Sequence, residues 1–239
     1  MKQRLTSFKW LSTLITCGAA IVSIQSAAAH QLWIERSGDG KFTVRFGEAG
    51  SNGEKPEYEK SPGVLDKMQG LSVWTMFPAK SDIEPELYKA TPQEDGFVVE
   101  EVSEKLPLLA QTAFPVRKRE ATADRPASAS FTTAFARWQP KGVQAEPTTT
   151  LDLIPSPEGG KATVYFKGKP VAGVKVTLFS PASKPVPLES GADGTVTFNG
   201  EGKGDFILWA HHSEPAEGLY LGSPYTALGY MVCVSWNQD

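Results

Sequence analysis

Cysteine and histidine are scarce in this chain of 239 residues, which holds two cysteines and three histidines. Two cysteines are too few for a scaffold held together by disulfides. An excess of one charge is also lacking, because 24 Lys and Arg stand against 27 Asp and Glu. A broad nucleic-acid-binding surface needs clustered basic residues, so we expect no nucleic-acid partner. After the first 29 residues, no stretch approaches the ~20 apolar residues of a membrane-spanning helix, so we expect no direct membrane span.

The first 29 residues have the layout of a secretory signal peptide. A basic start at residues 2–9 precedes a largely apolar run at 10–24, and three alanines at 27–29 supply small residues for cleavage. We therefore expect residues 1–29 to be removed and the protein to be exported to the periplasm. His30 then becomes the first residue of the mature chain.

The two cysteines offer one alternative and one structural expectation. The segment that ends at Cys17 resembles a lipoprotein cleavage box, in which Cys17 would carry the lipid. The apolar run continues past Cys17, which favours the signal peptide over the lipoprotein. After cleavage Cys233 is the only cysteine left, and its apolar surroundings predict a buried thiol rather than a nucleophile.

The mature chain reads as strands separated by turns, which predicts an all-β fold. Prolines and threonines gather near residues 146–157, so we predict an irregular β domain over 30–148 and an immunoglobulin-like or transthyretin-like β-sandwich over 149–239. Helical turns are expected only at 64–69 and 82–88, and a charged loop at 117–127. A strand at 206–211 is expected to end near Ser213. The apolar positions of the strands predict a core that includes Phe42, Val44, Phe46, Val164, Phe166, Val174, Val176, Phe198, Phe206 and Leu208.

The three histidines of the mature chain are His30, His211 and His212. A terminal His30 would offer its amine and its ring to one metal ion, and an imidazole from His211 or His212 would complete three nitrogen ligands. Neighbouring side chains on a strand point to opposite faces, but a strand end leaves the choice between the two open. The alternative is a solvated terminus and an ordinary strand end with no shared site.

Other chemistry-bearing patterns are weaker. Glu35 and Glu48 could supply a carboxylate, yet both read as solvated charges, as does the acidic run of Glu54, Glu57 and Glu59. Nucleophile-elbow, phosphate-loop and dinucleotide motifs are lacking. We therefore predict a binding protein without turnover.

Two motifs carry a family resemblance. The stretch His-Gln-Leu-Trp-Ile-Glu at 30–35, directly after the leader, resembles the start of a bacterial periplasmic family of unknown function that is associated with nickel or cobalt uptake. The segments 168–176, 193–198 and 204–210 resemble carboxypeptidase-regulatory-like, immunoglobulin-like modules. The resemblance implies a nickel or cobalt ion as ligand, a membrane metal-uptake transporter as partner, and a histidine just after the last of these segments, where His211 and His212 lie.

Competing functions share the same residues. Copper is the runner-up metal, because nitrogen-rich sites bind it most tightly among the divalent ions. A terminal and an internal histidine on a β-sandwich would also suit a histidine-brace copper protein or a copper-dependent polysaccharide monooxygenase. The lack of disulfides disfavours such a secreted oxidase. A structural module without a ligand is the third alternative.

Overall fold

The computed structural model of the chain describes residues 30–76, 84–123, 126–200 and 202–238. The predicted signal peptide and Cys17 lie outside the described residues. The all-β class is confirmed, with 60% of the chain in strands and 2% in helix. Within the described ranges the helical content is one short 3-10 turn, η1 (Leu65–Lys67), which falls inside the helical turn predicted at 64–69.

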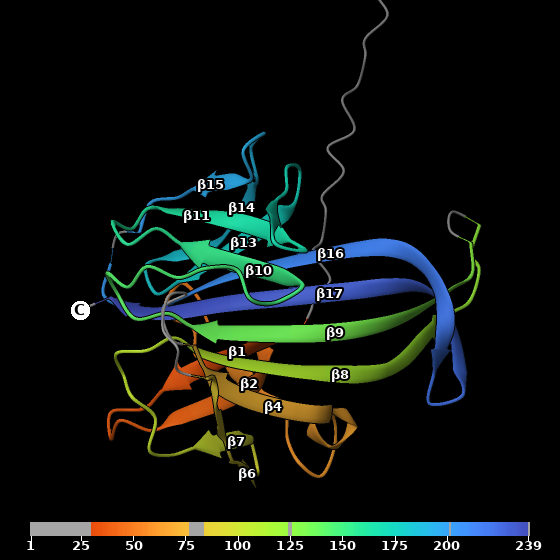
Figure 1. Cartoon of the computed structure of the whole chain (residues 1–239), viewed down its shortest axis with the longest axis horizontal. Helices are drawn as coiled ribbons and strands as arrows, with labels where there is room; N and C mark the ends of the chain where they lie inside the picture. The colour runs from red at the N-terminus through yellow and green to blue at the C-terminus, as the bar shows by residue number, and fades with distance from the viewer. Residues whose placement is uncertain (1–29, 77–83, 124–125, 201, 239) are drawn as a thin grey trace, which may run out of the picture.

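An eight-stranded sheet forms the middle layer of the molecule (Figure 1). All neighbouring strands in it run antiparallel except the central pair β17 and β9, which is parallel. Its order across the sheet is β14 (Ser183–Glu189), β13 (Lys175–Ser180), β16 (Gly204–Tyr220), β17 (Ser223–Gln238), β9 (Ser128–Trp138), β8 (Leu108–Arg119), β4 (Gln69–Thr75) and β5 (Glu86–Tyr88).

A five-stranded sheet covers one face of this layer. The contact is apolar, because Leu32, Ile34 and Val44 of the small sheet share a buried cluster with Ala110 and Ala136 of the middle layer. Burial of such side chains supplies the main stabilisation of a layered β fold. The strands are β1 (Gln31–Arg36), β2 (Phe42–Glu48), β7 (Gly96–Val99) and β6 (Ala90–Gln93) in that order, with β3 (Glu57–Tyr58) paired to β2.

A four-stranded sheet covers the opposite face over β13, β16 and β17. Leu153 and Val164 of this sheet interdigitate with Phe206, Leu208 and other apolar residues of the middle layer to form a second buried cluster. The result on this side is a β-sandwich. Its outer strands are β10 (Leu151–Pro155), β11 (Lys161–Phe166), β12 (Lys169–Pro170) and β15 (Thr195–Thr197).

The boundary predicted near residue 148 separates two stretches of chain that share the middle sheet. Strands β17 and β9, one from each side of the boundary, pair over nine register positions from Ala227↔Ser130 to Ser235↔Trp138. A buried ion pair adds to the junction, because Arg137 on β9 bonds Asp152 on β10 with both side chains almost fully enclosed. The two halves therefore pack as layers around one common sheet.

The predicted core is largely confirmed. Eight of its ten residues are buried, while Phe166 and Phe198 are half-buried and pack against the edge of the sandwich cluster.

Three local predictions are wrong. Residues 86–88 form strand β5 rather than part of a helical turn, and β8 extends as far as Arg119 into the predicted charged loop. Strand β16 does not end near Ser213 but continues to Tyr220, because β17 pairs with it through Tyr220↔Ser223. Partner strands override the weak local signals of Pro215 and of the charged residues.

Candidate metal site

His30 lies immediately before β1 and is in contact with a carboxylate. Its Nε2 faces Oε1 of Glu59 at ion-pair distance, and the imidazole ring stacks on Phe46 with ring centroids 5.5 Å apart. The His30 side chain is 42% exposed and that of Glu59 is 25% exposed. An imidazole nitrogen and a carboxylate oxygen are therefore held together at a partly open surface.

The position of Glu59 follows from the pairing of β3 with β2. Strand β3 pairs through Gly47↔Tyr58, and the backbone N–H of Glu59 donates to the carbonyl of Phe46 at 2.8 Å. A side chain at Gly47 is excluded, because its Cβ would lie 2.0 Å from the carbonyl oxygen of Glu57. Glycine at this position thus allows the close approach that brings Glu59 to His30.

A charged network behind β3 fixes this strand. Arg45 on β2 donates to Glu35 at 2.9 Å and pairs with Asp95 at 2.6 Å, and its guanidinium lies 4.3 Å from the centre of the Tyr58 ring. Tyr58 donates its hydroxyl to Glu35 at 3.0 Å. Burial and the Glu35 carboxylate raise the pKa of Tyr58 to about 12. Glu35 is therefore engaged in positioning β3, and Glu48 lies opposite Glu57 in the β2–β3 ladder.

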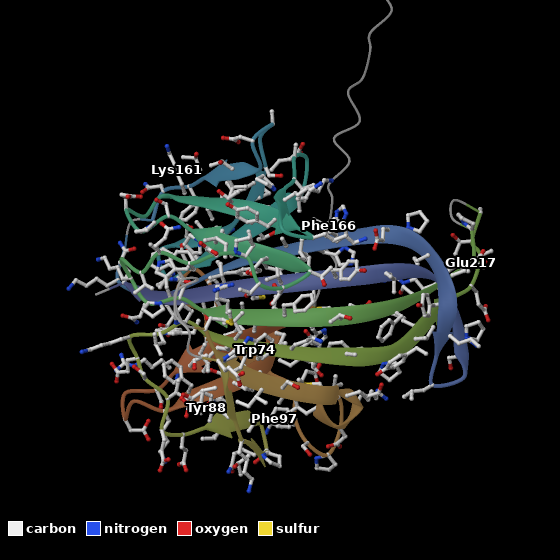
Figure 2. The ribbon with its side chains drawn as sticks, in the orientation of Figure 1. Trp74, Tyr88, Phe97, Lys161, Phe166 and Glu217 are labelled. Atoms are coloured by element: carbon white, nitrogen blue, oxygen red, sulfur yellow. The ribbon has the colours of Figure 1, made fainter. Side chains whose placement is uncertain are left out.

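His211 and His212 point to opposite faces of the middle sheet. Ile207 and Trp209 precede His211 at alternate positions of β16, and both pack on the β1 side with Trp33. The ring of His212 instead lies 4.4 Å from that of Phe166 on β11, on the side of the four-stranded sheet. Figure 2 labels Phe166 on that side. Of the two histidines, His211 is the one on the same side as His30.

A row of contacts runs across this face from His30 towards His211. Phe46, on which His30 stacks, lies 4.9 Å from Phe114 of β8. Phe114 is opposite Thr132 of β9, which is in turn opposite Gly229 of β17. A Cβ built on Gly229 would lie 2.8 Å from Oγ1 of Thr132 and 3.5 Å from Nε2 of His211. The Thr132 side chain and the His211 ring therefore fill the space that a side chain at residue 229 would need.

The ionisation of His211 suits a ligand. The residue is exposed on the sheet, but partial desolvation of its ring lowers its pKa, with smaller effects from His212 and Arg119. A neutral imidazole has a nitrogen lone pair available for a metal ion, whereas a protonated one does not.

The three histidines do not form one group. In residues 30–76, 84–123, 126–200 and 202–238, no three His, Cys, Asp or Glu side chains are grouped so as to hold a metal ion. The structure joins His30 to Glu59, sets His211 on the same side and His212 on the other. The site as predicted, with its metal, remains a prediction.

Glu59 is the residue that sequence reasoning missed, since it reads as one more acid in a solvated run. Its neighbours Glu54 and Glu57 are exposed, as expected. The available signal was the alternation of the acids around Tyr58, which would have suggested a short strand.

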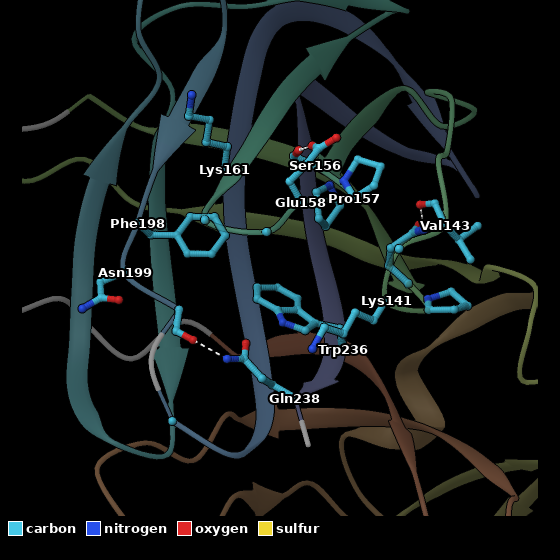
Figure 3. Close-up of a pocket in the computed structure, with 18 residues that line it drawn as sticks. Lys141, Val143, Ser156, Pro157, Glu158, Lys161, Phe198, Asn199, Trp236 and Gln238 are labelled. Atoms are coloured by element: carbon cyan, nitrogen blue, oxygen red, sulfur yellow. Dashed lines mark hydrogen bonds between the residues drawn. The ribbon is translucent and has the colours of Figure 1, made fainter.

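A separate cavity lies at the end of the sandwich, between the segments 139–143, 155–161 and 198–200 (Figure 3). It measures about 580 Å³, and Trp236 and Phe198 line it, with ring centroids 5.9 Å apart. Lys161, Glu158 and Gln238 add polar groups to the wall. No histidine lines this cavity, so it is separate from the candidate metal site.

Comparison with known proteins adds no assignment. No protein-family model, no curated protein and no solved structure matches the chain. Among the described residues, no helix is long and apolar enough to cross a membrane.

Proposed function

We propose that the protein binds one divalent transition-metal ion in the periplasm, with His30 and Glu59 as the centre of the site. The observation that carries the proposal is the contact between the His30 imidazole and the Glu59 carboxylate at the predicted start of the mature chain. Cleavage before His30 would add a terminal amine beside this pair.

The donor set fits a borderline metal. Imidazole and amine nitrogens favour nickel, cobalt, copper and zinc, whereas the single carboxylate disfavours calcium or magnesium, which prefer an all-oxygen shell. Of the two internal histidines, His211 is the one on the His30 side of the middle sheet. Strands β17 and β9 lie between its strand β16 and Phe114 of β8, which contacts the Phe46 under His30, so we centre the ion on His30 and Glu59 and test His211 as a further ligand by substitution. His212, whose ring lies 4.4 Å from that of Phe166 on the other side of the sheet, is outside the site.

Nickel or cobalt is the metal that the family resemblance favours, and copper is the runner-up. The role is binding and delivery of the ion for uptake, with a membrane transporter as the receiver. A copper-dependent oxidase would use the same nitrogen ligands. Oxygen-dependent turnover of a polysaccharide by the copper-loaded protein would identify that enzyme instead.

The test is titration calorimetry with nickel and with copper on the correctly processed protein. We compare the mature chain with a chain that keeps one alanine before His30, and with Glu59→Gln and His211→Ala. We expect the extra alanine to weaken binding strongly, because the terminal chelate is lost while every side chain remains. Removal of one ligand should weaken binding by roughly 10-fold or more.

His212→Ala is the matched control, because it removes the adjacent imidazole from the opposite face. It should keep the affinity of the mature protein. Equal affinities for the mature, alanine-extended and Glu59→Gln proteins would overturn the proposed site, and circular dichroism of each variant would verify that it is folded.

A further inference from the structure

The hairpin of β16 and β17 extends well beyond the two outer sheets. Strand β13 pairs with β16 only as far as Ala210, and β9 pairs with β17 only from Ala227. The outermost part, from Gly218 to Tyr225, pairs only with itself. Figure 1 shows this end curving away from the two outer sheets, and Figure 2 labels Glu217 there. The hairpin therefore offers a surface that the core of the fold does not require.

Aromatic stacking holds the hairpin end in place. The ring of Tyr220 stacks on Phe131 of β9 at 4.0 Å between centroids, and Tyr225 lies 5.8 Å from the same ring. Gly218 is needed for this arrangement, because a Cβ there would lie 2.4 Å from the Tyr225 hydroxyl. The apex is thus a positioned element and not a loose loop.

The apex carries two largely exposed leucines. Leu219 is 72% exposed and Leu221 is 77% exposed. Leu221 and Gly222 occupy the turn with φ of 47° and 77°, the left-handed values of a tight hairpin turn that favours Asn-Gly. Leucine is unfavourable here both in conformation and in solvation. An apolar side chain at such a position is explained if the apex enters an apolar medium.

Basic residues lie at the same end of the sheet. Arg117, Lys118 and Arg119 end β8 opposite residues 128–130 of β9, close to the Phe131 that anchors the apex. Within the part of the chain that the structure describes, no carboxylate pairs with these three side chains at ion-pair distance. The acids Glu120 and Glu217 are at this end too and leave a small basic excess.

We propose that this end of the molecule binds the surface of an anionic lipid membrane, with Leu219 and Leu221 inserted among the lipids and the basic residues of β8 at the headgroups. Exposed apolar side chains next to tyrosines and cations are the combination that a membrane interface accommodates, since it is apolar below and anionic and wet above. An apolar surface on a protein partner would cover the leucines, but it would not explain the basic residues beside them.

The experiment is co-sedimentation of the mature protein with vesicles. Phosphatidylcholine vesicles with phosphatidylglycerol are compared with pure phosphatidylcholine. We expect binding to the anionic vesicles that weakens as salt rises. Leu221→Asn should weaken it by about 10-fold, because one inserted leucine is lost. Arg117→Gln with Lys118→Gln should reduce the preference for anionic vesicles.

Two features of the design keep the outcome interpretable. Asn is the favoured residue at a left-handed turn position, so Leu221→Asn should unfold at a temperature no lower than the parent protein. Leu87→Asn is the matched control, because Leu87 is 75% exposed on the distant edge strand β5 and should leave vesicle binding unchanged.

Two results would overturn the proposal. The first is a parent protein that binds neither type of vesicle, or a Leu221→Asn variant that binds anionic vesicles as tightly as the parent protein does. The second is a parent protein that does not bind vesicles but self-associates in sedimentation velocity, with the self-association abolished by Leu221→Asn. That result would identify a second copy of the chain as the partner of the apex.

Discussion

The buried pair of Arg137 and Asp152 links β9 of the middle layer to β10 of the four-stranded sheet, and Arg137→Met tests how far the stability of the protein depends on this pair. The two side chains are 2% and 1% exposed. Arg137 donates from Nε to Oδ1 at 3.1 Å and from Nη2 to Oδ2 at 2.7 Å. Nη2 also lies 3.2 Å from the hydroxyl of Thr148 in the connecting segment. Methionine keeps the apolar length of the side chain and removes its charge.

The expected loss of unfolding free energy depends on the Asp152 carboxylate, which Arg137→Met leaves buried without its cation. An unpaired buried charge costs about 3–5 kcal/mol. Asp152 keeps backbone N–H donors from Thr148 and Leu153, each at 3.0 Å, so we expect a value near the lower end of that range. At roughly 2–4 °C per kcal/mol for a chain of this size, the unfolding temperature should fall by about 6–12 °C.

Denaturant unfolding followed by tryptophan fluorescence gives the free energy directly. The double variant Arg137→Met/Asp152→Leu removes both charges, and we expect it to be more stable than Arg137→Met alone. A loss below about 1 kcal/mol for Arg137→Met, the cost of an exposed pair, would refute the assignment of Arg137 as a buried structural cation.

Other perturbations have equally definite outcomes. Phe206→Ala should cost about 3–5 kcal/mol in denaturant unfolding, because Phe206 is fully buried between the sandwich sheets; a loss below about 1 kcal/mol would contradict this. Gly47→Ala should displace β3 and lower metal affinity in calorimetry together with the unfolding temperature, and an unchanged affinity would contradict the proposed role of Glu59. Cys233, fully enclosed and with a pKa raised by burial, should react with a thiol reagent only when the protein unfolds. Nickel affinity should fall as pH drops through the imidazole range near ~6.5, because protons compete for the ring nitrogens, and a flat profile would exclude imidazole ligands.

Hydrophobic alternation was sufficient to predict the class of the fold and most of its core. Phe42 and Val44, like Phe206 and Leu208, occupy one phase of a strand, and the structure buries all four. Alternation carries no information on which strands become neighbours. The parallel pairing of β9 with β17 joins residues about a hundred positions apart, which no local pattern in either strand specifies.

For the candidate site, too, the sequence indicated residues but not which of them the fold brings together. The sequence singled out the three histidines by their rarity and by the predicted cleavage before His30. It could not separate His211 from His212, because that choice depends on β16 continuing as a strand to Tyr220. Nor could it single out Glu59, whose approach to His30 depends on the pairing of a two-residue strand beside Gly47.

The central claim is that the mature terminus and the neighbouring side chains hold one metal ion, and X-ray absorption of the nickel-loaded, correctly processed protein tests it most directly. The account predicts a shell of nitrogen and oxygen donors with imidazole scattering that falls in His30→Ala and persists in His212→Ala. A shell containing sulfur, or imidazole scattering that is unchanged in His30→Ala, would contradict it.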